Sequence, residues 1–304
     1  MATKRTLFSE EQQRLRAILQ SAAISALMDS RRWQPGELAF QGGTCLHLAY
    51  GSARFSEDLD FMVRGGLSLE GLAKEVLRRI RLPPDIPADM TVVVSKGKDE
   101  RNPHVFMITL GGPNVIGSAK VKIELRQTKE TALNSLKLVV STITSPAGGQ
   151  AFVPVLTLDE ILADKVYALG ARNRLKARDV FDLWWLCEQK PLVLNPDALC
   201  TRLDIYPDET GDRAHTAQRW ITAAQKRLAD LRAAQNVRAV AADLQRWLPS
   251  SWLMNDQVAI GMIESAAQKL QGGIQIMSER FGQAERMQGD QLASPQRDEG
   301  RARG

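Results

Sequence analysis

Hydrophobic and polar positions follow two different periods along the chain, and the change falls near residue 150. Before it, several short runs alternate with period two, which is typical of strands. In the clearest run, residues 119–125, apolar side chains alternate with Lys120, Lys122 and Glu124. Alternation of this kind predicts a sheet whose apolar face is covered by helices while its other face stays open. The predicted strands are 58–63, 91–94, 105–110, 119–125 and 138–143.

Apolar residues recur at helical spacing in the remaining segments, mostly beyond residue 150. The predicted helices are 9–32, 45–50, 68–80, 157–172, 177–186, 197–205, 212–234, 236–248 and 255–282. The pattern therefore predicts an α+β fold: a mixed α/β half over residues 1–150 and an all-helical half over 151–285. Residues 286–304 are polar and rich in Gly, Gln, Arg and Asp, which predicts a disordered tail.

Composition narrows the classes of protein that this chain can represent. It has 304 residues, 44% hydrophobic, with 40 Lys and Arg against 35 Asp and Glu. This mildly basic balance permits a nucleotide or nucleic-acid partner without requiring one. Three widely spaced cysteines, Cys45, Cys187 and Cys200, form neither a zinc motif nor a disulfide framework. Without a signal peptide or an apolar run of about 18 residues, we expect a cytoplasmic protein with no membrane span.

One stretch combines a glycine turn with two closely spaced carboxylates. Gly42 and Gly43 precede a short helix, so main-chain N–H groups at its start could hold phosphate. Alone, such a glycine pair is most often only a tight turn. Asp58 and Asp60 follow on a predicted strand, where they share one face about 7 Å apart. Two such carboxylates are typical of sites that hold Mg²⁺ for phosphoryl or nucleotidyl transfer.

Further carboxylates and one lysine could complete such a site. Glu124 is a candidate third carboxylate on a neighbouring strand, or equally a surface partner of Lys122 or Arg126. Lys165 lies in an apolar helix, where it could contact triphosphate oxygens or extend along the helix edge into solvent.

Asp179 and Asp182 share a helix face because they are three residues apart. They could orient Lys165 or a metal-bound water. Alternatively, they stabilise the N-terminus of their own helix.

Four motifs in this order resemble the AbiEii/AbiGii nucleotidyltransferase toxins, over about residues 35–190. They are Gly-Gly-Thr-x-Leu at 42–46, Arg-Phe-Ser-x-Asp-Leu-Asp-Phe at 54–61, Ala-Asp-Lys at 163–165 and Arg-Asp-Val-Phe-Asp-Leu at 178–183. The resemblance implies a fold like that of DNA polymerase β. It also implies a toxin of a bacterial toxin–antitoxin or abortive-infection system that defends against phage, and some such toxins transfer nucleotides to the acceptor end of tRNA.

By motif, the resemblance implies that Ser56 and Asp58 contact the triphosphate and the metal, and that Asp60 is a second metal ligand. It implies that Lys165 binds phosphate and that Asp179 is the functional acid of the last motif.

Other positions of the same motifs are expected near the nucleotide. Gly42, Gly43 and Thr44 would contact the NTP, and Arg178 and Asp182 belong to the last motif. Thr44 stands where related enzymes more often carry serine, so a hydroxyl is kept. The expected cofactor is Mg²⁺ or Mn²⁺, with an NTP as substrate. The expected partners are an RNA acceptor, namely tRNA, and a cognate antitoxin. The alternatives are the same chemistry on a small molecule or a protein (AMP transfer), or a non-catalytic nucleotide-binding module.

Overall fold

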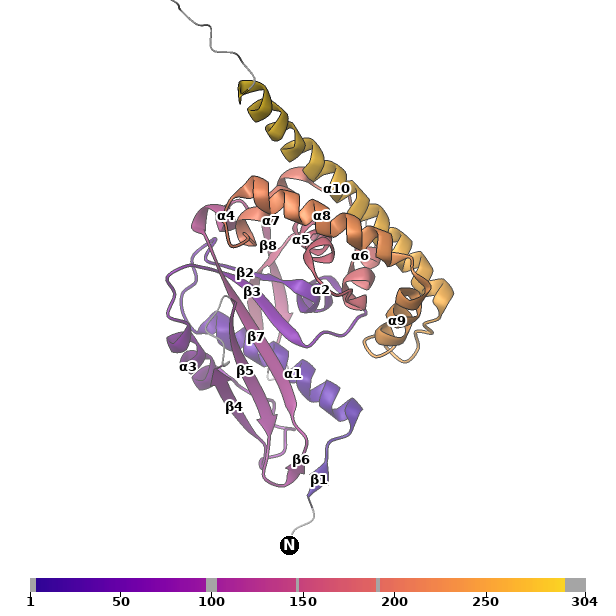
Figure 1. Cartoon of the computed structure of the whole chain (residues 1–304). Coiled ribbons are helices and arrows are strands. Elements are labelled where there is room, and N and C mark those ends of the chain that lie inside the picture. Colours follow the sequence, from indigo (N-terminus) through magenta and orange to yellow (C-terminus); the bar gives the residue numbers. More distant parts are fainter. Residues whose placement is uncertain (1–3, 97–102, 146–147, 190–191, 293–304) are drawn as a thin grey trace, which may run out of the picture.

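The protein is described by a computed structural model over residues 4–96, 103–145, 148–189 and 192–292 (Figure 1). Seven strands form one sheet: β2 (Leu38–Gln41), β3 (Asp58–Arg64), β4 (Thr91–Lys96), β5 (His104–Gly111), β7 (Ala119–Thr128), β8 (Leu138–Thr144) and β9 (Gln150–Leu156). Their order across the sheet is β4-β5-β7-β3-β2-β9-β8. All five predicted strands are present.

Strand directions make this sheet a mixed one. β3 runs parallel to β7 and β2 runs parallel to β9, whereas the other neighbouring strands are antiparallel. A small separate sheet pairs β1 (Arg5–Thr6) with β6 (Val115–Ile116). The predicted α+β fold with a mixed sheet is therefore confirmed.

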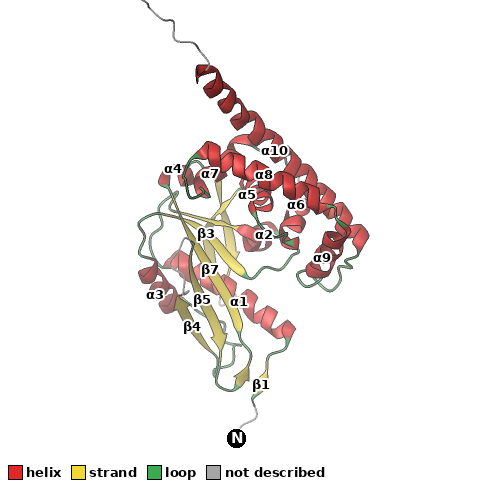
Figure 2. Cartoon of the chain, in the orientation of Figure 1, coloured by secondary structure: helices red, strands yellow, loops and turns green. Residues whose placement is uncertain are grey.

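The helices divide into two groups (Figure 2). α1 packs against α3 and β7 beside the sheet, and α5 to α10 gather at one end of it. None of the described helices is long and apolar enough to cross a membrane. The bounds are α1 (Ser9–Asp29), α2 (Gly42–Tyr50), α3 (Leu69–Arg79), α4 (Glu130–Asn134), α5 (Leu158–Ala171), α6 (Ala177–Gln189), α7 (Pro196–Ile205), α8 (Arg213–Leu231), α9 (Ala234–Leu244) and α10 (Asp256–Leu292).

Strand β7 shows how the sequence positions the two faces of the sheet. Val121, Ile123 and Leu125 are fully buried, and α1 packs against this strand. Lys122 and Glu124 point to the opposite face and stay partly exposed. The predicted one-sided alternation is therefore confirmed, and the open face is where polar chemistry can be placed.

Two predicted boundaries need correction. Residues 150–156, expected at the start of the helical half, form β9 between β2 and β8. Pro154 lies within this strand. Proline cannot donate a ladder hydrogen bond, so its presence disfavours the prediction of a strand that has neighbours on both sides.

The end of the chain is the second correction. Residues 286–292, expected to be disordered, continue α10 as far as Leu292, and residues 293–304 lie outside the described part. The segment is polar, but five of its seven residues are Arg, Met, Gln or Leu, which are good helix formers, so low hydrophobicity alone did not predict its structure.

Close contact between helices of the bundle depends on two glycines around Trp220. The indole N–H of Trp220, on α8, donates to the Tyr167 carbonyl at 2.8 Å. A Cβ on Gly170 of α5 would lie 2.8 Å from the Trp220 ring. A Cβ on Gly273 of α10 would lie 2.8 Å from Val166 and 3.2 Å from Trp220. Three helices therefore meet at distances that only glycine allows.

This contact predicts opposite outcomes at two adjacent glycines of α10. Gly273→Ala should lower the free energy of unfolding by about 1–3 kcal/mol, because the methyl group overpacks the Trp220 contact. Gly272→Ala is the matched control, since nothing lies within 4 Å of its Cβ position. It should raise stability by up to about 1 kcal/mol through helix propensity. Denaturant unfolding of both variants tests this, and equal effects would contradict the packing described.

Candidate functional site

A row of polar side chains crosses the open face of the sheet. Gln41 of β2 pairs with Asp60 of β3, and Asp60 pairs with Glu124 of β7. Asp58, two residues before Asp60, lies on the same face opposite Lys122. The structure therefore brings the three predicted carboxylates, Asp58, Asp60 and Glu124, onto neighbouring positions of two parallel strands.

Lys122 lies between two of these carboxylates. Its Nζ is 3.0 Å from Asp58 Oδ2 and 2.6 Å from Glu124 Oε1. Burial alone would lower the pKa of Lys122, but its hydrogen bonds to Glu124 and Asp58 outweigh burial and raise it. The expected ion pair of Glu124 with Lys122 is present, and Glu124 also lies beside Asp60, where its role as a third carboxylate stays a prediction.

Asp60 is the carboxylate that lacks a partner. Within the described part of the chain, no hydrogen bond or ion pair reaches its side chain. Burial, followed by the charges of Glu124 and Asp58, raises the pKa of Asp60 to about 7. The site therefore holds Asp60 at a cost that a nearby cation would remove.

The residues fit a divalent cation in composition, although they are not arranged around one. Over the described ranges, no three His, Cys, Asp or Glu side chains are grouped closely enough to hold a metal ion. The row nevertheless offers oxygen ligands of the type that Mg²⁺ prefers. Burial and repulsion from Glu124 and Asp58 raise the pKa of Asp60, and a bound cation would offset both effects. Asp58, Asp60 and Glu124 consequently remain the predicted metal ligands.

The two glycines of the first motif let other groups approach the start of α2. Gly42 has a φ of +80°, and a Cβ there would collide with the Asp60 carboxylate. A Cβ on Gly43 would collide with the Arg54 guanidinium and lie 3.1 Å from Ser56 Oγ. Glycine is therefore required by close approach as well as by conformation.

Thr44 has a different place from the one expected. Its side chain is completely buried, and its hydroxyl donates to the main-chain carbonyl of Asp58. This hydrogen bond ties α2 to the strand that carries the carboxylates. The Thr44 hydroxyl thus has a structural partner, which the motif alone did not indicate.

Lys165 of α5 faces the sheet from the helical bundle. It is only 8% exposed, so the alternative of a lysine extending into solvent is wrong. Its Nζ lies 2.8 Å from Asp182 and 3.3 Å from Asp179, both on α6. Burial would lower the pKa of Lys165, but Asp182 and Asp179 outweigh burial and raise it. The lysine is therefore held as a cation.

Arg54 was part of a quoted motif but had no predicted role, and it proves to be central. It is 2% exposed, and its Nε and Nη2 each lie 2.9 Å from one oxygen of Asp182. Burial opposes ionisation of Asp182, yet Arg54 and Lys165 lower its pKa to about 2. The partners are 128 residues apart in the sequence, so no local pattern could have paired them.

Asp179 and Arg178 have further contacts at the start of α6. Asp179 accepts a hydrogen bond from Arg172 at 2.7 Å as well as from Lys165. The Arg178 guanidinium lies 4.5 Å from the centre of the Trp247 ring. Asp179 thus links two cations, and Arg178 is stacked in place.

Most of these side chains converge on one small cavity of about 130 Å³, here called the cationic recess. Six Arg and Lys residues line it against four carboxylates. Thr44 and the fully buried Asp182 do not line it, although Asp182 supports two residues that do. The lining residues are Gly43, Arg54, Ser56, Asp58, Asp60, Lys122, Glu124, Lys165, Arg172, Lys176, Arg178 and Asp179.

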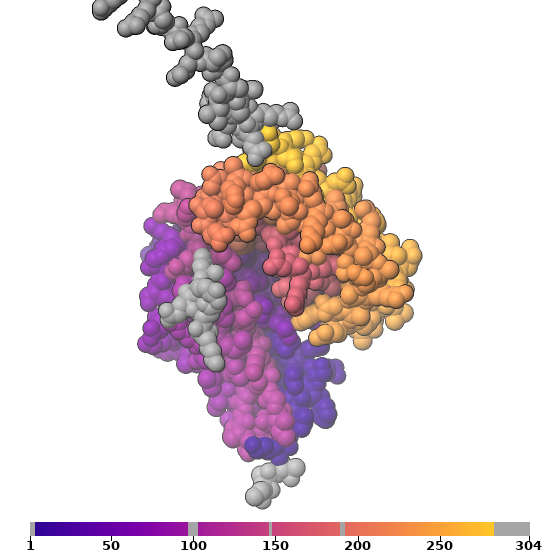
Figure 3. Space-filling view, viewed as in Figure 1, coloured from indigo at the N-terminus to yellow at the C-terminus, as the bar shows by residue number. Residues whose placement is uncertain are grey.

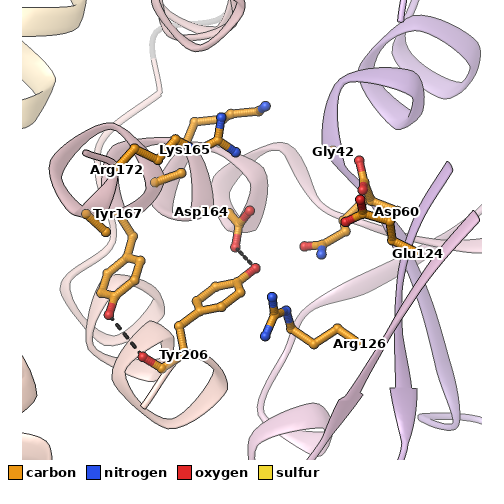
Figure 4. A pocket seen from close by; sticks show the side chains of 12 residues that line it. Gly42, Asp60, Glu124, Arg126, Asp164, Lys165, Tyr167, Arg172 and Tyr206 are labelled. Atoms are coloured by element: carbon orange, nitrogen blue, oxygen red, sulfur yellow. Dashed lines mark hydrogen bonds between the residues drawn. The ribbon is translucent and has the colours of Figure 1, made fainter. Parts of the chain in front are cut away.

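A second cavity of about 300 Å³, here called the aromatic cavity, adjoins the recess between the sheet and α5 (Figure 4). The two cavities share Asp60, Glu124, Lys165 and Arg172. In the space-filling view, helical residues overhang the strands at this end of the molecule (Figure 3). The remaining lining residues are Gln41, Gly42, Arg126, Asp164, Tyr167, Ala168, Ala171 and Tyr206.

Comparison with known proteins gives a family match and several similar structures. The family model described as nucleotidyl transferase AbiEii toxin, type IV toxin–antitoxin system, matches residues 26–253. MenT4, a nucleotidyltransferase toxin from Mycobacterium tuberculosis, has a similar structure with a TM-score of 0.51 at 16% identity, covering 93% of each chain. JHP933 from Helicobacter pylori gives 0.46 at 20% identity, over 93% of this chain and 98% of its own. The search of curated proteins gives no match. At these identities the structural likeness shows the fold alone.

The raised pKa of Asp60 predicts a pH-dependent cost to folding. The pKa of Asp60 is about 7 in the folded protein and near 4 when unfolded. The folded state therefore binds more protons over this window and loses stability as pH rises through it. Asp60→Asn should leave the melting temperature nearly unchanged at pH 4.5 and raise it by a few degrees at pH 8 in metal-free buffer.

Thermal unfolding at both pH values checks this prediction. Asp89→Asn, at an exposed aspartate, is the matched control and should show no pH-dependent gain. If Asp60→Asn melts at a lower temperature than the wild type at pH 8, the ionised Asp60 does not destabilise the folded protein, and the prediction is wrong.

Proposed function

Because the chain belongs to the AbiEii nucleotidyltransferase toxin family of type IV toxin–antitoxin systems, we propose that it transfers nucleotides from an NTP to RNA. The 3′ acceptor end of tRNA is the proposed site of addition. Modification there would block translation and thereby limit phage growth. The cationic recess beside the carboxylate row is the observation that carries this proposal.

The recess suits the triphosphate tail of the nucleotide. Six cationic side chains line this space of about 130 Å³ and outnumber its four carboxylates, which leaves a positively charged lining for phosphate oxygens. Ser56 and the main chain at Gly43 lie at the start of α2, where phosphate is favoured. Lys165 adds a cation that Asp179 and Asp182 hold in place.

The carboxylate row suits the metal that this chemistry uses. Asp58, Asp60 and Glu124 would hold Mg²⁺ or Mn²⁺, which supplies charge neutralisation at the phosphates and lowers the pKa of the attacking hydroxyl. Lys122 forms ion pairs with both Asp58 and Glu124 and offsets part of their charge in the present arrangement.

In the transfer, the 3′ oxygen of the acceptor forms a bond to the α-phosphorus, and the bond to the pyrophosphate oxygen breaks. A carboxylate of the row takes the hydroxyl proton. Lys165 and the arginines of the recess offset the charge that develops on the leaving pyrophosphate.

The partners follow from the same family. A type IV system includes a cognate antitoxin, which we propose acts either by binding or at the level of expression. An RNA acceptor is compatible with the net charge of +5.

Incubation with Mg²⁺, labelled NTPs and total RNA tests the proposal. The wild-type protein should label RNA of tRNA size. Asp58→Ala should lower incorporation at least 100-fold, because it removes a proposed ligand of the metal that neutralises charge in the transition state. Asp89→Ala, at an exposed aspartate, is the matched control and should keep wild-type incorporation.

The fraction that takes up label decides between acceptors. Label in protein or in a small metabolite would replace RNA as the substrate. Equal incorporation by the wild type and Asp58→Ala would contradict the proposed site itself.

A further inference from the structure

Gln41 has a buried amide that nothing in the fold explains. The residue is 7% exposed, and its Oε1 is buried with no hydrogen-bond partner in the described structure. It lines the aromatic cavity, directly beside Asp60 in the carboxylate row. An unpaired buried amide oxygen costs free energy, and such groups are rare unless a ligand or a water satisfies them. The amide is therefore positioned to bind something within the cavity.

A stack of planar groups forms another wall of this cavity. Trp220 stacks on Tyr167 at 5.8 Å, and Tyr167 stacks on Tyr206 at 5.5 Å between ring centres. The Arg126 guanidinium ends the stack, 4.7 Å from the centre of the Tyr206 ring.

The stack holds the Arg126 guanidinium at the edge of the cavity. The Tyr206 hydroxyl donates to Asp164 at 2.9 Å, which fixes the Tyr206 ring (Figure 4). Arg126 lies between Tyr206 and the carboxylates Asp60 and Glu124 (Figure 4). A guanidinium plane presented in this way is a surface on which nucleobases stack.

The two cavities form one cleft with unlike ends. They share Asp60, Glu124, Lys165 and Arg172, so a ligand can extend from one to the other. One end is lined by cations, and the other by an amide, tyrosines and a guanidinium plane. The groups of an NTP follow one another in the same order: a charged triphosphate at one end, and a planar base with hydrogen-bond donors and acceptors at the other.

We propose that Gln41 and Arg126 form the subsite for the base of the incoming NTP, an inference that rests on the proposed function. The Gln41 amide offers one acceptor and two donors, which match a base edge with neighbouring donor and acceptor. The Arg126 plane stacks on the base. Gln41 sets which base is preferred, and Arg126 contributes to the affinity for every base.

Equilibrium binding of the four NTPs and of inorganic tripolyphosphate to the full chain tests this subsite. Gln41→Met keeps the size of the side chain but removes the amide. It should weaken the preferred NTP about tenfold, the scale of a hydrogen bond worth 1.4 kcal/mol, and reduce discrimination among the bases. Affinity for tripolyphosphate, which has no base, should stay within twofold. The melting temperature should not fall, because the variant removes an unpaired buried group.

Arg126→Lys is the second variant, since it keeps the charge but not the plane. It should weaken all four NTPs alike and leave their order of preference unchanged. Wild-type base discrimination in Gln41→Met would overturn the subsite, as would an equal loss of tripolyphosphate binding.

Two further outcomes distinguish this subsite from the alternatives. In one, the acceptor RNA occupies the site, and in the other, the proposed function fails. Altered preference only for the terminal nucleotide of the RNA would place the acceptor base, rather than the NTP base, at Gln41 and overturn the proposal. Binding of NTPs without any transfer by the wild type would sink the proposed function while the binding measurements still decide the subsite.

Discussion

The buried ion pair between Arg54 and Asp182 is the interaction on which the cleft depends. Arg54 precedes β3 on the sheet, and Asp182 lies on α6 of the helical bundle. Taking both charges out of water is costly, and two parallel 2.9 Å hydrogen bonds together with Lys165 offset that cost. Removal of Asp182 would leave the buried Arg54 without an anionic partner, and removal of Arg54 would leave Asp182 with Lys165 alone. The pair therefore fixes one wall of the cleft against the other.

The position of Lys165 follows from this pair. Asp182 binds Arg54 and Lys165 together, and Asp179 binds Lys165 and Arg172. Four charged side chains thereby hold one lysine at the junction of the two cavities, opposite the carboxylate row. Such preorganisation is what transfer of a charged phosphoryl group requires, because the positive charge is already in place when the reaction begins. Asp60, on the opposite wall, is the complementary feature, because its carboxylate has no ion-pair partner in the described structure and is available to bind a cation.

Local patterns in the sequence predicted those features that depend on a single element. The alternation of β7 placed Glu124 on the open face, and the spacing of Asp58 and Asp60 placed both on one side of β3. The pairing of Lys165 with Asp179 was also within reach, because their helices are adjacent in the chain.

Features that depend on distant partners were not predictable in this way. Nothing in the sequence indicated that Arg54 is buried against a residue 128 positions away, or that Lys122 bridges two site carboxylates. Burial of Thr44 and the unpaired amide of Gln41 likewise appear only once α2 and the sheet are packed. Pro154 concealed β9 because local propensity argued against a strand that the sheet nevertheless accepts.

A double-mutant cycle on Arg54 and Asp182 tests the central role of their ion pair most directly. The free energies of unfolding of the wild type, Arg54→Met, Asp182→Leu and the double variant are measured by denaturant titration. Each single variant should lose about 3–5 kcal/mol, because each removes one side of a buried, doubly hydrogen-bonded charge pair. The double variant should lose less than the sum of the two, with a coupling energy of at least about 2 kcal/mol. Additive losses, with a coupling below about 0.5 kcal/mol, would show that this pair does not hold the two walls of the cleft together.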